Sequence, residues 1–198
     1  YFYCDGANYN AIVGRVRPGD LGVDAMHINL HKTFSTPHGG GGPGAGPTVL
    51  SDALAPFAPL PLIVANMTAK SGVSVYDLAE HAEEVEGDGR APFGRMCAFH
   101  GQMGMFVRAL TYMFSHGSDG LRQVAEDAVL NANYLLARLR NHYNAPFGDG
   151  PCMHEALFDD TNFKAEGIET IDFAKALLDE GYHPFTTYFP LVVHGAML

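Results

Sequence analysis

Two side chains that could act together on a cofactor follow two short apolar segments of the sequence. Asp5 comes after an aromatic run at residues 1–4, and His31 and Lys32 come after the alternating segment 25–30. In open α/β sheets ligands bind at the carboxyl ends of strands, so two such strands would bring Asp5 and Lys32 into one crevice. A partly desolvated lysine has a lowered pKa and a free amine for Schiff-base chemistry. A facing aspartate can keep a pyridine nitrogen protonated, which would suit pyridoxal phosphate.

A glycine-rich segment, residues 39–47, follows Lys32 and is a second candidate for ligand binding. Glycines let the backbone come close to a ligand and offer N–H groups to an anion. Three of these glycines formally fit a dinucleotide-binding spacing, but Pro43 and Pro47 interrupt the helix that such a motif opens. A Walker-type phosphate loop needs its lysine after the glycines, whereas Lys32 precedes them.

Taken singly, these features have less specific interpretations. Asp5 before Gly6 is more often only a turn, and a lone lysine such as Lys32 is more often a solvated surface residue. The hypothesis of a cofactor site therefore depends on their combination.

Three histidines near Lys32 raise the alternative of a metal site. His27 and His31 are four positions apart and His38 follows, which on a helix would be metal-ligand spacing. The alternating pattern predicts a strand instead, where positions 27 and 31 would share a face about 13 Å apart. The sequence has no H-E-x-x-H motif and no cysteine near these histidines. We therefore expect no metal, and a metal-dependent hydrolase is the weaker alternative.

Strands and helices in alternation should position these residues. We expect strands at residues 1–4 and 25–30, and over 53–95 only connections with one short hairpin at most. A helix that Ser118 caps should bury one apolar face. That face consists of Leu121, Val124, Ala128, Val129, Ala132, Leu135, Leu136 and Leu139.

The last third of the chain should add one more helix and two strands. The helix should begin near Thr170, bury an apolar face that includes Phe173 and Leu177, and end at Gly181. Strands are expected at 153–158 and 187–193. The alternation predicts an α/β or α+β fold, with a domain break near residues 115–120.

Composition excludes several classes of protein. The 198 residues are 47% hydrophobic with a mean hydropathy of −0.01, and no run is long enough for a membrane helix. A net charge of −10 disfavours binding to nucleic acid or to an anionic membrane. The three cysteines are far apart, which favours a reducing, cytoplasmic location over a disulfide framework. The first residue is Tyr1 and both ends cut through predicted elements, so we expect a fragment.

Residues 27–34 (HINLHKTF), followed by 37–44 (PHGGGGPG), closely resemble the cofactor-lysine segment of glycine decarboxylase, the P-protein of the glycine cleavage system. The resemblance covers nearly the whole chain and is weakest between 58 and 92. Further matching motifs are 5–11 (DGANYNA), 17–20 (RPGD), 128–134 (AVLNANY) and 183–191 (HPFTTYFPL). Residues 99–104 (FHGQMG) and the absence of tryptophan resemble subunit 2 of the two-subunit form.

The resemblance implies a fold and a set of cofactor-binding residues. The fold would be the α/β fold of the aminotransferase-like, fold-type-I transferases that depend on pyridoxal 5'-phosphate. Residues 1–117 would be the C-terminal part of the large domain, and 118–198 a truncated small C-terminal domain. Lys32 would hold the cofactor as a Schiff base, and Asp5 would pair with the pyridinium nitrogen. Ala7 would pack against the ring, and His31 would contact the phosphate.

The resemblance also implies an activity and partners. The reaction would be the decarboxylation of glycine, with transfer of the aminomethyl group to the lipoyl arm of the H-protein. The companion subunit 1 would complete a heterotetramer. Three alternatives remain open at this point: another fold-type-I enzyme, such as a hydroxymethyltransferase or an amino-acid decarboxylase, a noncatalytic partner subunit, and a fragment that is inactive alone.

Overall fold

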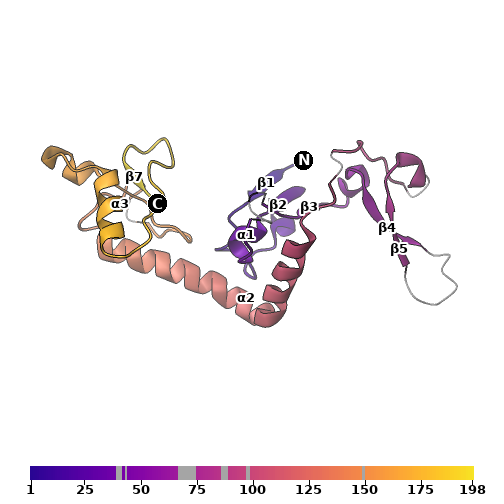
Figure 1. Cartoon of the computed structure of the whole chain (residues 1–198), viewed down its shortest axis with the longest axis horizontal. Coiled ribbons are helices and arrows are strands. Elements are labelled where there is room, and N and C mark those ends of the chain that lie inside the picture. The colour runs from indigo at the N-terminus through magenta and orange to yellow at the C-terminus, as the bar shows by residue number, and fades with distance from the viewer. Residues whose placement is uncertain (39–41, 43, 67–74, 86–88, 97–98, 149) are drawn as a thin grey trace. The chain divides into compact units, whose positions relative to one another are not determined.

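The computed structural model describes residues 1–198 apart from 39–41, 43, 67–74, 86–88, 97–98 and 149 (Figure 1). The chain forms two compact units. One contains Tyr1–Tyr9 and Val16–Gly117, and the other contains Asn10–Arg15 and Ser118–Leu198. The assignment of 1–117 and 118–198 to a large and a small domain stays a prediction.

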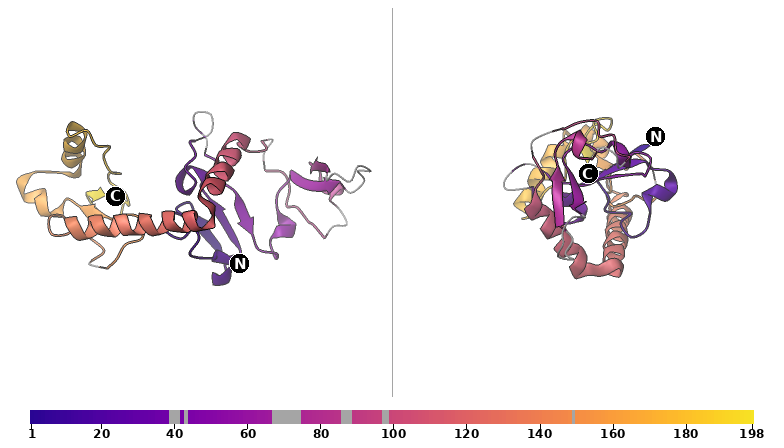
Figure 2. Two further views of the ribbon diagram at one scale, coloured as in Figure 1. Left: turned by 90° about the horizontal axis from the view of Figure 1, so that it is seen from below. Right: turned by 90° about the vertical axis from the view of Figure 1, so that its right-hand side faces the viewer.

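A three-stranded sheet forms the centre of the first unit (Figure 2, left view). β1 (Tyr3–Gly6) pairs in parallel with β2 (Ala25–Ile28), and β2 pairs in antiparallel fashion with β3 (Thr48–Leu50). The register joins Asp5 to His27, so β1 and β2 end level with each other. The strands predicted at residues 1–4 and 25–30 therefore exist, with bounds shifted by about two residues.

A single helical turn, α1 (Leu30–Thr33), replaces the predicted last part of the second strand and contains Lys32. Leu30 and Thr33 are buried on its inner side, which favours a turn over continued extension. The turn closes when the Thr36 N–H donates to the Leu30 carbonyl at 3.2 Å. Ser35, with φ of 56°, makes the left-handed reversal that ends it.

A hairpin follows in the first unit, as predicted for residues 53–95. β4 (Leu62–Asn66) and β5 (Val75–Ala79) pair in antiparallel fashion, with Ile63 opposite Leu78. Short 3₁₀ turns lie at Pro18–Leu21, Ala55–Phe57 and Ala82–Glu84.

The helix α2 (Met103–Leu139) is longer than predicted and is interrupted at Gly117, where φ is 64° and ψ is −176°. The part after Gly117 is the helix predicted from Ser118, and it buries Ala125, Ala132 and Leu136. The part before Gly117 was not predicted. Leu135, predicted on the buried face, is 52% exposed.

The second unit contains the part of α2 after Gly117, α3 (Thr170–Asp179) and a small two-stranded sheet. α3 begins with a capping box between Glu169 and Asp172 and ends before Gly181, with φ of 82°, as predicted. β6 (Phe158–Asp159) pairs with β7 (Ala196–Met197), and a 3₁₀ turn lies at Thr161–Glu166. The core contains Leu136, Phe158 and Met197, with aromatic side chains packed against it.

The strands predicted at 153–158 and 187–193 are wrong. In segment 153–158, only Phe158 lies in a strand. The backbone just before this segment is held by α2, because the Asn133 side chain hydrogen-bonds both the N–H and the carbonyl of Cys152. In the second, Thr187 makes one isolated bridge to Met197, and residues 190–195 form turns. No helix in the described part of the chain is long and apolar enough to cross a membrane.

Candidate cofactor site

Asp5 lies at the carboxyl end of β1, where two groups hold one of its oxygens. The Ala7 N–H donates to Asp5 Oδ1 at 2.9 Å, and His27 Nε2 lies 3.5 Å from the same oxygen. No residue that the structure describes hydrogen-bonds Asp5 Oδ2. The side chain is 70% exposed, so this second oxygen is available to a ligand.

Lys32 lies in the helical turn that follows β2, at the sheet edge where β1 also ends. The parallel register brings the carboxyl ends of the two strands together, as the prediction of one crevice requires. The Lys32 side chain is exposed. The residues described therefore do not bury the Lys32 amine. The expectation from the sequence that this amine is partly desolvated is wrong for this chain alone.

His31 is half-buried beside Lys32 and packs edge-on against His38, with ring centroids 4.0 Å apart. Its Nδ1 is buried and has no hydrogen-bond partner among the residues described. Burial lowers the pKa of His31 below its usual value, and the positive charges of His38 and Lys32 lower it further. A neutral imidazole is favoured here, and it can donate or accept one hydrogen bond.

The end of the glycine segment packs directly on the backbone between β2 and α1. The Leu30 N–H donates to the Ala45 carbonyl and the Ile28 N–H to the Pro47 carbonyl, both at 3.0 Å. A Cβ on Gly46 would collide with the Ile28 carbonyl oxygen. The described glycines thus allow close backbone packing, whereas residues 39–41 and 43, also predicted to approach a ligand, lie outside the described part.

The three histidines considered as metal ligands lie in different elements: His27 in β2, His31 in α1 and His38 in the segment that follows. His31 lies in α1 and not in a strand with His27, so the predicted 13 Å spacing on one strand face is wrong. Within the described ranges, no group of three or more histidine, cysteine, aspartate or glutamate side chains could hold a metal ion.

The chemistry of these groups fits pyridoxal phosphate. Three groups lie at or beside one sheet edge. They are the exposed amine of Lys32, the Asp5 carboxylate with its free Oδ2, and the half-buried His31 imidazole with its unpaired Nδ1. The contact of His27 with Asp5 was not predicted from the sequence. It could have been predicted from the parallel register, because paired residues of neighbouring strands share a face.

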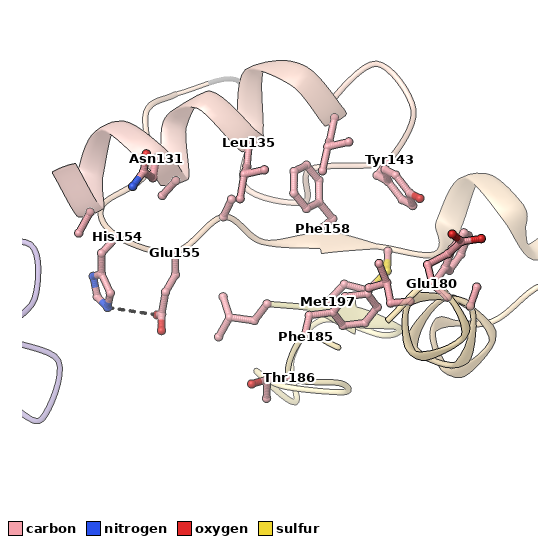
Figure 3. Close-up of a pocket in the computed structure, with 18 residues that line it drawn as sticks. Asn131, Leu135, Tyr143, His154, Glu155, Phe158, Glu180, Phe185, Thr186 and Met197 are labelled. Carbon is pink, nitrogen blue, oxygen red and sulfur yellow. Dashed lines mark ion pairs between the residues drawn. The ribbon is translucent and has the colours of Figure 1, made fainter. Parts of the chain in front are cut away.

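A cavity of about 790 Å³ lies in the second unit and contains none of the predicted site residues (Figure 3). Leu135, Phe158, Phe185 and Met197 line it, and a single ion pair, His154 Nε2 to Glu155 Oε2 at 3.6 Å, lies at its wall. Nothing in the sequence analysis indicated this cavity.

Comparisons with known proteins identify relatives along the whole chain. Residues 124–198 match the family model of the glycine dehydrogenase C-terminal domain. The chain is 70% identical over 198 residues to the probable glycine dehydrogenase (decarboxylating) subunit 2 of Caulobacter vibrioides. It is 49% identical over 197 residues to the protein of that name from Chlorobaculum tepidum. The chain spans 36% and 38% of these two relatives.

A solved structure shows the same fold. It is a crystal structure of glycine decarboxylase (P-protein) of the glycine cleavage system in inhibitor-bound form, with a TM-score of 0.70. The match covers 98% of this chain and 49% of that chain at 18% sequence identity. The resemblance stated from the sequence motifs is confirmed, and so is the α/β fold shared with this glycine decarboxylase.

Proposed function

Because this chain is homologous over its whole length to part of subunit 2 of glycine dehydrogenase (decarboxylating), we propose that the complete protein decarboxylates glycine with pyridoxal phosphate. The aminomethyl group then passes to the lipoyl arm of the H-protein, whose disulfide is reduced. This chain contributes the lysine that holds the cofactor.

One observation supports this function most directly: β1 and β2 are parallel and end in register, with Asp5 at the end of one and Lys32 just after the other. Strand ends at one edge are where ligands bind in α/β sheets. An amine and a carboxylate at this edge are the two groups that a Schiff-base lysine and a ring-nitrogen partner would require.

The residues at this edge have separate roles in the proposal. The Lys32 amine would hold the cofactor covalently, and as a free amine it would move protons during the reaction. Asp5 Oδ2 would accept a hydrogen bond from the ring nitrogen, Ala7 would pack against the ring and His31 would contact the phosphate. When bound, pyridoxal phosphate accepts the electron pair that remains as carbon dioxide leaves.

The proposal includes partners and a location. The name subunit 2 of the relatives implies a companion subunit, and we place subunit 1 with this protein in a heterotetramer. Cys4 and Cys152 are free thiols, which agrees with a cytoplasmic location.

The test is glycine-dependent release of carbon dioxide by the complete protein, co-produced with its companion subunit and supplied with lipoylated H-protein. The parent should release carbon dioxide and Lys32→Ala should lose that activity. Lys175→Ala, at an exposed position of α3, is the matched control and should keep it. A parent that releases no carbon dioxide from glycine would contradict the proposed substrate.

A further inference from the structure

One face of the sheet aligns three polar side chains that lead to the cofactor site. Tyr3 and Asp5 are two apart in β1 and share a face, and His27 is the register partner of Asp5 in β2. The Tyr3 hydroxyl hydrogen-bonds His27 Nδ1, and their rings stack with an interplanar angle of 9°. His27 Nε2 lies 3.5 Å from Asp5 Oδ1.

We infer that His27 is a positioning residue for the cofactor, acting through Asp5, and that Tyr3 sets its tautomer. The inference rests on the proposed function and deepens it by adding two residues to the same site. A phenol O–H that donates to Nδ1 leaves the imidazole proton on Nε2. The proton is then on the nitrogen that lies 3.5 Å from Asp5 Oδ1.

The two oxygens of Asp5 consequently have different surroundings. Oδ1 receives the Ala7 N–H and faces His27, whereas Oδ2 has no hydrogen bond from the residues described. The Ala7 hydrogen bond and the His27 nitrogen at 3.5 Å are both on Oδ1 and restrict rotation of the carboxylate. They leave Oδ2 directed to a ligand. The neighbour of His27 on β3 is Thr48, which has no charge to compete with Asp5.

The expected effect is modest because the groups are partly exposed. The side chain of His27 is 31% exposed and that of Asp5 is 70% exposed, so solvent weakens their interaction. Loss of this polar contact with the carboxylate should raise the dissociation constant of pyridoxal phosphate by about threefold to tenfold.

The test uses the complete protein with its companion subunit and measures cofactor affinity and the absorption spectrum of the bound cofactor. His27→Leu should raise the dissociation constant and shift the spectrum, and His27→Gln, which keeps an N–H donor, should recover most of both. Tyr3→Phe should have a smaller effect. His142→Leu, at an exposed histidine, should change neither.

A double-mutant cycle separates positioning from a structural role. If His27 acts through Asp5, His27→Leu has little further effect in an Asp5→Asn background. An equal effect in both backgrounds, or unchanged affinity in His27→Leu, overturns the inference.

Nitrogen NMR of the unloaded protein gives a readout independent of the cofactor: His27 should carry its proton on Nε2, and a proton on Nδ1 overturns the assignment. A parent that binds no pyridoxal phosphate overturns the proposed function as well. If the parent and His27→Leu bind pyridoxal phosphate equally tightly, only the inference about His27 is overturned.

Discussion

At the scale of single residues, His31 shows how packing sets a charge state next to the predicted cofactor lysine. Burial lowers its pKa first, and the charges of His38 and Lys32 add to this. The folded chain therefore disfavours the imidazolium. As pH falls through the ordinary value of about 6.5, the unfolded chain gains a proton before the folded chain does, and stability decreases. Above that pH His31 has no such effect, because it is neutral in both states.

We predict that NMR titration places the pKa of His31 below 6.5 and that His38→Ala raises it without fully restoring the ordinary value, since burial is the larger cause. His142→Ala, at an exposed position, is the control and should leave the titration of His31 unchanged. A His31 pKa at or above 6.5 in the parent would contradict this account.

At the residue scale, the sequence predicts on which strand ends the candidate site residues lie, and their roles at the site stay predictions. Asp5 and Lys32 were predicted at the ends of neighbouring strands, and the parallel register places those ends together. The contact of His27 with Asp5 was not predictable in the same way, because it depends on cross-strand register. The expected burial of Lys32 failed because the residues described leave its side chain exposed.

At the scale of elements, Asn133 connects α2 to the segment before β6. Its Nδ2 donates to the carbonyls of Val129 and Cys152 at 2.8 and 2.7 Å, and its Oδ1 accepts from the Cys152 N–H at 2.9 Å. We predict that Asn133→Asp destabilises the protein by about 2 to 3 kcal/mol in urea unfolding, because a carboxylate cannot donate and would face two carbonyls.

Asn131→Asp makes the same chemical change at an exposed position of the same helix, and it should lower the free energy of unfolding far less. Equal losses in the two variants would show that the pairing with Cys152 contributes nothing measurable.

The glycine segment gives a second prediction at this scale. A Cβ at Gly46 would collide with the Ile28 carbonyl oxygen, so Gly46→Ala must displace the backbone that precedes Lys32. We expect a loss of about 1 to 3 kcal/mol in unfolding free energy and weaker retention of pyridoxal phosphate. Gly19→Ala, where nothing lies within 4 Å of the added Cβ, should change the unfolding free energy by less than about 0.5 kcal/mol. A Gly46→Ala variant as stable as Gly19→Ala would refute this explanation.

Elements were predicted best where a local pattern determines them. The helix from Ser118 and the end of α3 at Gly181 follow from apolar periodicity and a left-handed glycine. The strands expected at 153–158 and 187–193 failed because tertiary contacts decide those segments. Asn133 fixes Cys152, and Leu191 and Val192 are more than 80% exposed instead of lying in a core.

At the scale of the whole molecule, the chain spans about a third of the length of its relatives and forms two compact units. The motifs predicted a resemblance to glycine decarboxylase, and the comparison with the Caulobacter vibrioides relative confirms that resemblance along the whole chain. Composition alone could not have done so, because an acidic, moderately hydrophobic chain is compatible with many folds. The roles of the two units as parts of a large and a small domain remain predictions.

The central claim is that Lys32 holds pyridoxal phosphate, and the most direct measurement is borohydride reduction followed by peptide mass spectrometry. The complete protein, co-produced with its companion subunit, should yield one labelled peptide that carries the reduced cofactor on Lys32, and Lys32→Ala should yield none. A label on another lysine, or no label in a parent that folds and assembles, would contradict the claim.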